Sequence, residues 1–279
     1  MQCTGALRKL AADATSGELI FPTHAHVALQ IRLALDDPEI HLERVATLVQ
    51  GEPLLAAKAV AIANSVAFNR SGIPVTEVRG AVVRLGIALI RALATSVILR
   101  QLSATPSAAH QAIASRLWEH SAHVAALSFI LAKKVSKQNP DKALFAGIVH
   151  ELVYFFLISR AKDHPELIHA SLDETWHTDG AALVQNAVSK ALSIPNEIAE
   201  AIVGMHAGQF SLPPRSLADT LLLANCLSPI VNPFEETSHA RQREEILALS
   251  TQIIPNRTLS ELLEDSAEEL STLMSALAA

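Results

Sequence analysis

Cysteine, aromatic residues and glycine are all scarce in this 279-residue sequence. Its two cysteines, Cys3 and Cys226, lie far apart and form no C-x-x-C pair, so the sequence supports neither a disulfide framework nor a structural zinc site. Aromatic residues make up 4% of the chain, and no run of alternating aromatic and β-branched residues indicates a strand. These absences exclude disulfide-rich and collagen-like folds and argue against a sheet.

Clusters of positive charge are missing as well. The sequence has 22 basic and 28 acidic residues, which give a net charge of −6, and its longest basic block is the pair Lys133-Lys134. We therefore expect no nucleic-acid-binding surface. The segment Met1–Thr15 contains only short apolar runs, so no signal peptide is expected, and the few cysteines fit a reducing cytoplasm.

The sequence is instead rich in aliphatic residues that recur with helical spacing. Half of its residues are hydrophobic, and because few of these are aromatic, they are mainly Ala, Leu, Val and Ile. This pattern predicts an all-α fold. The predicted helices cover a short segment beginning near residue 7, then residues 24–36, 41–50, 53–65, 76–101 with a break at Gly86, 109–136, 141–159, 178–192, 196–206, 217–227, 240–249 and 259–278.

The most apolar stretch, Ala143–Ser159, is about as long as a membrane-spanning helix. His150 and Glu151 lie at its centre, where ionisable groups cost several kcal/mol in lipid. We therefore interpret it as a buried core helix and expect no membrane association.

The polar segment Ser103–Ser107, which contains Pro106, predicts a boundary between two domains, residues 1–105 and residues 106–279. Near the other breaks, polar residues predict helix ends. Asn196 follows a break at Pro195 and is expected to cap the next helix.

Several polar residues in the first half have ordinary structural explanations. The pair Asn64-Ser65 is expected to cap a helix end, because short polar side chains bond to nearby backbone groups. Gly86 is expected to be a break or a close-packing position. Arg84 and Arg91, seven residues apart, are interpreted as a solvated helix face rather than as a phosphate site.

A series of short motifs resembles the signature of the HDOD domain, a bacterial signalling relative of the HD phosphohydrolases. The resemblance covers about Leu19 to Ser228 and implies an N-terminal helical bundle packed on an HD-like helical core. The motifs that carry it, in chain order, are Phe21-Pro22, Glu52-Pro53-Leu54-Leu55, Ala63-Asn64-Ser65-Val66-Ala67-Phe68, Ile73-Pro74-Val75, Ala81-Val82-Val83-Arg84-Leu85-Gly86, Leu117-Trp118-Glu119-His120-Ser121, the run from Ala143 to Glu151, the run from Glu174 to Ala181, and Ile194-Pro195 with the run from Ile198 to Ile202.

The same resemblance implies which residues would form an HD-type metal site. HD enzymes use histidines and aspartates because imidazole and carboxylate together suit a divalent ion that polarises water and a phosphoryl oxygen. By motif position the candidates are His120, His150, Glu151, His177 and His206, with Asn225 in the place of the terminal aspartate.

Two of these positions depart from the family pattern. Glu151 is one methylene longer than the expected aspartate, and Asn225 has no anionic oxygen, although ligand charge sets the affinity of such sites. Paired histidines near His206 and a Gly-Tyr-Pro motif after it are also missing from the sequence. His123 could share a helix face with His120, but a packed core histidine is the commoner outcome.

The sequence therefore predicts a non-catalytic HDOD regulatory protein that acts through signalling proteins or a small ligand. No catalytic residues and no cofactor are expected. The alternative is a metal-dependent phosphohydrolase that acts on a nucleotide or cyclic dinucleotide and binds Fe, Mn, Ni or Zn. A third hypothesis is a degenerate site that holds a cyclic dinucleotide without cleaving it.

Overall fold

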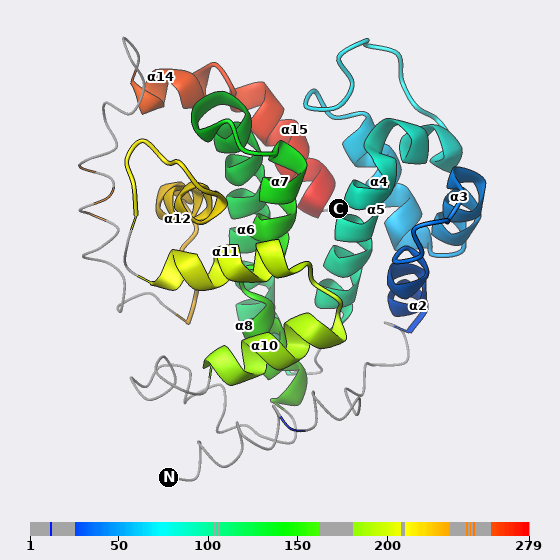
Figure 1. The fold of residues 1–279 in the computed structure, drawn as a ribbon, viewed down its shortest axis with the longest axis horizontal. Helices are drawn as coiled ribbons and strands as arrows, with labels where there is room; N and C mark the ends of the chain where they lie inside the picture. The colour runs from blue at the N-terminus through cyan, green and yellow to red at the C-terminus, as the bar shows by residue number, and fades with distance from the viewer. Residues whose placement is uncertain are drawn as a thin grey trace.

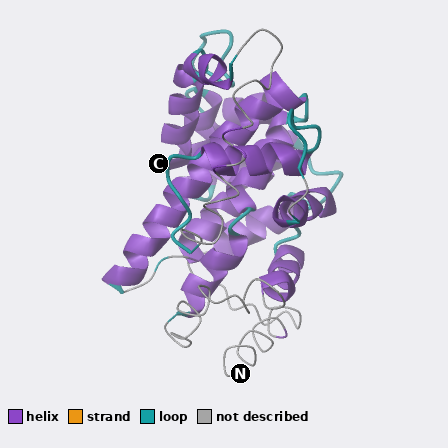
Figure 2. Cartoon of the chain, turned by 90° about the vertical axis from the view of Figure 1, so that its left-hand side faces the viewer, coloured by secondary structure: helices purple, strands orange, loops and turns teal. Residues whose placement is uncertain are grey.

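A computed structural model describes residues 26–102, 107–161, 181–207, 210–234 and 258–278, together with the single positions 12, 104, 244, 246 and 248. Every regular element in these residues is helical (Figures 1 and 2), as predicted. The elements are α2 (His26–Ala34), α3 (Leu42–Gln50), α4 (Pro53–Ala63), α5 (Val78–Leu102), α6 (Ala108–Leu131), the π-helical turn η2 (Ala132–Ser136), α7 (Pro140–Val149), α8 (Leu152–Arg160), α10 (Ala181–Ala191), α11 (Asn196–His206), α12 (Leu217–Leu227), α14 (Leu259–Glu264) and α15 (Ala267–Ala278).

The starts of several helices follow from their capping residues. The Glu52 carboxylate accepts a hydrogen bond from the Leu55 amide, and Pro53 is the first residue of α4. α11 covers the predicted residues 196–206, but the role predicted for Asn196 is wrong. Pro195 takes the N-cap position there, with no side-chain cap, because Asn196 already has helical geometry.

The breaks between helices are less regular than the sequence predicts. The predicted helix over 141–159 is two helices, α7 and α8, separated by His150 and Glu151, and the predicted helix over 259–278 is likewise divided into α14 and α15. The break at Gly86 is confirmed. Gly86 has φ 76° and ψ 164°, and no atom lies within 4 Å of the position that a Cβ would take. The backbone conformation, rather than close packing, therefore requires glycine there.

Asn64 caps the C-terminal end of α4, as predicted, and its side chain also holds the following loop. Its amide group accepts from Val75 N–H and donates to Val75 O, both at 2.7 Å. Arg84 donates to Ala63 O and to Ile73 O, both at 3.0 Å, and Arg91 donates to a carbonyl at the end of α2. The interpretation of these arginines as a solvated face is therefore wrong, because they satisfy carbonyl groups that helix ends and loops leave without partners.

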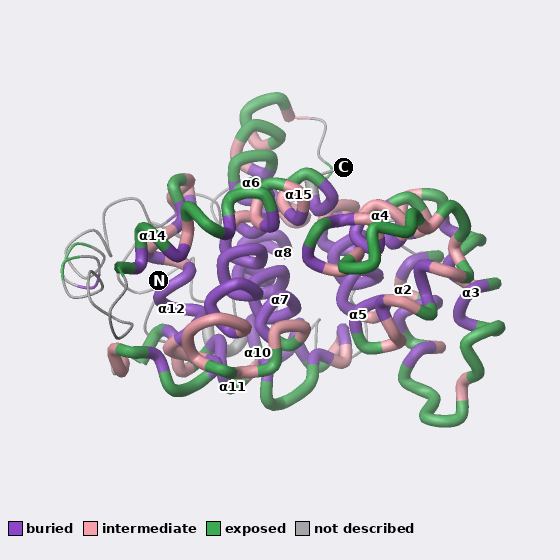
Figure 3. The backbone as a smooth tube through the Cα atoms, turned by 90° about the horizontal axis from the view of Figure 1, so that it is seen from above, coloured by how far each residue is buried: buried purple, intermediate pink, exposed green. Residues whose placement is uncertain are grey.

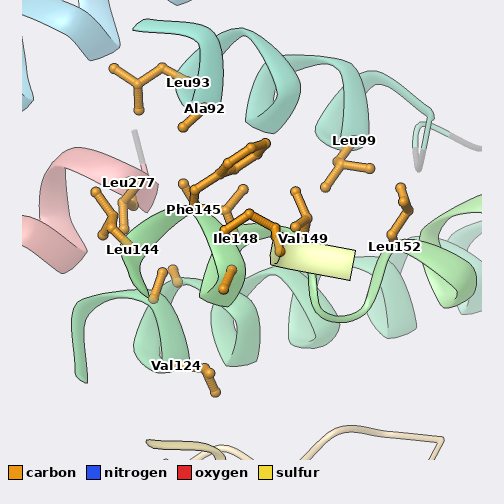
Figure 4. Close-up of a cluster of buried hydrophobic side chains, with 14 of the residues drawn as sticks. Ala92, Leu93, Leu99, Val124, Leu144, Phe145, Ile148, Val149, Leu152 and Leu277 are labelled. Carbon is orange, nitrogen blue, oxygen red and sulfur yellow. The ribbon is translucent and has the colours of Figure 1, made fainter. Parts of the chain in front are cut away.

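The core runs through both halves of the chain. α5 packs against α2, α3 and α4 on one side and against α7 and α8 on the other. The buried residues are concentrated along α5, α6, α7 and α8 (Figure 3). Figure 4 shows part of this core, where side chains of α5, α6, α7, α8 and α15 meet in one cluster. The predicted boundary between residues 105 and 106 falls between α5 and α6, and the domain division stays a prediction.

Within the described residues, the two stretches Val78–Leu102 and Pro140–Arg160 are long and apolar enough to cross a membrane by length and composition. In the folded chain, 67% and 89% of their most apolar windows are buried among other parts of the protein. The second stretch contains Ala143–Ser159, whose apolar side chains are buried in the core.

α6 and α7 pack closely against each other at Gly147. A Cβ at Gly147 would lie 2.4 Å from the Cα of Ala125 and 2.7 Å from its amide nitrogen. Since these neighbours are backbone atoms of α6, they cannot rotate away. Gly147 therefore allows α7 to approach α6 far more closely than any residue with a side chain would.

Replacing Gly147 by alanine should push α6 and α7 apart. We expect Gly147→Ala to lower the free energy of unfolding by about 1–3 kcal/mol, the usual cost of overpacking a core, measured by urea denaturation. Gly51→Ala is the control, because its added carbon would lie 3.2 Å from Leu48 O and 3.9 Å from Thr47 O, distances that need at most a small shift. Equal urea midpoints for Gly147→Ala and the native protein would contradict this role of Gly147.

Candidate metal centre

Three of the candidate ligands meet inside the helical core. His120 lies on α6, His150 is the C-cap of α7, and Glu151 is the N-cap of α8. Their residues are 1%, 3% and 1% exposed, respectively. The break between α7 and α8 brings His150 and Glu151 to the same side, and the contact at Gly147 brings this break close to α6.

The ligand atoms of the three residues form a small triangle. Nε2 of His120 lies 3.2 Å from Nε2 of His150, and Oε1 of Glu151 lies 3.2 Å from His150 Nε2 and 3.6 Å from His120 Nε2. All three ligand atoms lie within 4.8 Å of one another, so one metal ion could contact all of them.

Backbone carbonyl groups fix which nitrogen of each ring carries a proton. His120 Nδ1 lies 2.6 Å from Ile230 O, and His150 Nδ1 lies 2.7 Å from Gly147 O. A carbonyl oxygen only accepts hydrogen bonds, so both Nδ1 atoms must donate. In the neutral rings, both Nε2 atoms then present lone pairs toward each other and toward Glu151.

Three electron-pair donors that face one another in a buried space need a positive charge between them. Glu151 Oε1 is buried and has no hydrogen-bond partner. This is expected of an oxygen atom that binds a metal ion instead of a hydrogen-bond donor. An ion about 2.0–2.1 Å from each of three tetrahedral ligands would separate them by about 3.3 Å. The residues therefore fit one divalent ion, and a proton on one histidine is the other way to supply the charge.

The electrostatics of Glu151 agree with this demand. Burial alone would raise the pKa of its carboxyl, but attraction to His150 and interactions with His120 outweigh burial and hold the pKa well below its ordinary value. The carboxylate is thus ionised inside the core and supplies the single negative charge of the triangle.

His206, another predicted ligand, does not join this group. His206 is exposed at the end of α11, and its Nδ1 bonds to Ile202 O in the same helix. Asn225 is half-buried on α12, and His177 lies outside the described residues. His123 is half-buried on α6, where burial and then the neighbouring His120 lower its pKa.

Sequence reasoning missed the backbone partners of the two histidines. The backbone carbonyl groups of Ile230 and Gly147 orient the two histidines and set their tautomers. Ile230 O also accepts a hydrogen bond from the Ser228 hydroxyl. In the same segment, the Phe234 ring stacks on Tyr154, with centroids 4.7 Å apart. No sequence signal could have identified them, since any residue type supplies a carbonyl oxygen.

The family profile of the HDOD domain matches residues 21–194. The chain belongs to the HDOD family. The predicted resemblance is therefore confirmed, and the helices from α2 to α10 lie within the matched residues. A search of the curated proteins gives no match.

Solved structures share this HDOD fold at low sequence identity. A candidate metal-dependent phosphohydrolase from Shewanella amazonensis SB2B is 22% identical, with a TM-score of 0.67 over 99% of this chain and 100% of the other. An HDOD domain protein of unknown function from Geobacter sulfurreducens is 20% identical, with a TM-score of 0.59 over 96% of each chain. A candidate signal transduction protein from Marinobacter aquaeolei VT8 is 18% identical, with a TM-score of 0.55 over 99% of this chain and 66% of the other. These similarities show the fold.

Removing one histidine should leave the buried carboxylate without its nearest partner. We expect His150→Ala to lower the free energy of unfolding by about 3–5 kcal/mol, as when a buried ion pair loses one member. Denaturant unfolding measures the change. His206→Ala is the matched control, and because His206 is exposed we expect a change of less than about 0.5 kcal/mol. Similar losses in the two variants would argue against a charged triangle.

Proposed function

We propose that this HDOD protein is a non-catalytic regulator that acts in the bacterial cytoplasm by contacting other signalling proteins or a small ligand. The observation that carries this proposal is the closure of the candidate metal centre. His120, His150 and Glu151 are at most 3% exposed, so a phosphate ester has no direct approach to their ligand atoms. A catalytic metal site needs an open position for water and substrate.

The charge of the site supports the same conclusion. Glu151 supplies the only carboxylate in the three-residue group found among the described residues. A phosphohydrolase must compensate the metal charge and also polarise water and a phosphoryl oxygen. A divalent ion held by His120, His150 and Glu151 would supply Lewis acidity. Because these three residues come from α6, α7 and α8, the ion would also join the three helices.

A metal-dependent phosphohydrolase is the second candidate function. The triangle of two imidazole nitrogens and one carboxylate oxygen favours it, because these atoms are ligands of catalytic divalent ions. The name of the Shewanella amazonensis protein points in the same direction. In this alternative, the substrate is a nucleotide or a cyclic dinucleotide, and His177 is the fourth ligand. The closed centre must then open to admit the substrate. Binding of a cyclic dinucleotide without cleavage is a third hypothesis.

An activity assay separates the first two functions. We expect the purified protein, supplied with Mn²⁺ or Mg²⁺, to show no hydrolysis of a cyclic dinucleotide or of a chromogenic phosphodiester above the rate of the protein-free buffer. The physical reason is that the ligand atoms are closed to substrate. Glu151→Gln, which keeps the shape of the side chain, is the matched variant.

Clear turnover by the native protein that disappears in folded Glu151→Gln would refute the regulatory proposal. Elemental analysis of protein purified without chelator adds a second criterion. Fe, Mn, Ni or Zn near one ion per chain without turnover would identify a structural ion, whereas absence of these metals would count against the phosphohydrolase.

A further inference from the structure

The C-terminal helix α15 joins the two halves of the described fold. It packs against α6 of the core and against α4 of the N-terminal bundle (Figure 1). Leu273 and Leu277 are fully buried, and Leu277 belongs to the cluster drawn in Figure 4 together with residues of α5 and α7. The helix therefore covers apolar surface that would otherwise face water.

The N-terminal end of α15 is anchored to the core by charge. Glu269 pairs with Lys133 and Lys134 of η2, and the Lys134 ammonium also donates to the Ser266 hydroxyl at 2.6 Å. The Glu269 side chain is 11% exposed, so these pairs are partly shielded from water. A carboxylate in the first turn of a helix also suits the helix dipole.

The C-terminal end of α15 is anchored differently. Lys58 of α4 is fully buried, and its ammonium donates to Leu277 O at 2.7 Å. The last carbonyl groups of a helix have no partner within it, and they form the negative end of its dipole. Lys58 thus caps α15 from another part of the chain.

The surroundings of the Lys58 ammonium supply no neutralising carboxylate within the part of the chain that the structure describes. α5 contributes Arg100, a second cation, and α6 contributes the ring of Trp118, whose centroid lies 5.6 Å from the ammonium. α15 contributes the carbonyl of Leu277. Burial, and then repulsion by Arg100, lower the pKa of Lys58 to about 8.

We infer that α15 is a releasable strap, whose C-terminal end detaches from α4 and α6 because its docking keeps the Lys58 ammonium buried with no carboxylate partner among the described residues. Release returns this charge to water, while Glu269 stays paired and keeps the start of the helix in place. Detachment uncovers the apolar face formed by α4 and α6. This inference stands independently of the proposed function, because it depends only on the contacts of α15.

Hydrogen exchange on the full chain at pH 7 tests the strap. Lys58→Met keeps the length of the side chain and removes its charge. Loss of the buried charge should stabilise the docked α15, whereas loss of the hydrogen bond to Leu277 O should destabilise it. We expect exchange of the amides in the last two turns of α15 to become slower by about tenfold or more, because each unit of lowered pKa is a tenfold factor in the docking equilibrium. Exchange in α6 and α7 should stay unchanged.

Lys137→Met is the matched control, since the exposed Lys137 also donates to a backbone carbonyl, that of Lys134, at 3.1 Å. It should leave exchange in α15 unchanged. Faster or equal exchange of α15 in Lys58→Met would overturn the inference, because the hydrogen bond would then outweigh the buried charge.

The native protein provides a second measurement that needs no variant at Lys58. Because docking lowers the pKa of Lys58 from its ordinary 10.5 to about 8, the docked state binds the proton less strongly than the released state. Docking should therefore tighten as the pH rises through 8, and opening of α15, corrected for the intrinsic exchange rate, should fall by about tenfold or more between pH 7 and 9.5. A pH-independent opening rate would refute the strap.

Discussion

The close approach of α6 and α7 at Gly147 is the constraint on which the candidate metal centre depends. It lets α7 end directly beside His120, and the carbonyl of Gly147 then bonds to Nδ1 of His150. The same glycine therefore sets the distance between two helices and the tautomer of one histidine. A residue with a side chain at this position would still supply the carbonyl oxygen, but it would move α7, and His150 with it, away from α6.

Once the two histidines and Glu151 are held together, the core contains a negative charge that water cannot reach. Such a charge is tolerated only when it is paired, so the site demands either a metal ion or a proton. Under the proposed regulatory function, this demand explains how an HD-like centre can persist without a catalytic role. The triangle links α6, α7 and α8, and its contribution to the fold requires charge compensation but no access for substrate.

Much of the fold could be predicted from the sequence, because helical periodicity and caps are local signals. The helices over residues 196–206 and 217–227 and the break at Gly86 belong to this class. The break at His150 and Glu151 could not be predicted, since apolar residues continue on both sides of it. Motif order identified His120, His150 and Glu151 as a group, but the positions of His206 and Asn225 depend on how α11 and α12 pack. The roles of Arg84 and Arg91 were missed because the carbonyl groups that they contact have no sequence signal. Arg91 also pairs with the carboxylate of Asp36, at 3.4 Å.

Capping by distant cations is a recurring way in which this chain joins its parts. Arg32 at the end of α2 is fully buried and donates to Ser193 O beyond α10, just as Lys58 donates to Leu277 O. Both bonds connect the N-terminal bundle to helices from the second half of the chain. Arg32 also has a carboxylate partner, Asp36, at 2.6 Å, whereas Lys58 has Arg100 as its charged neighbour. A buried cation that has a carboxylate partner is less costly than one that has none among the described residues. The contact of α2 with the turn after α10 should therefore be permanent, and the contact of α4 with α15 should be the one that opens.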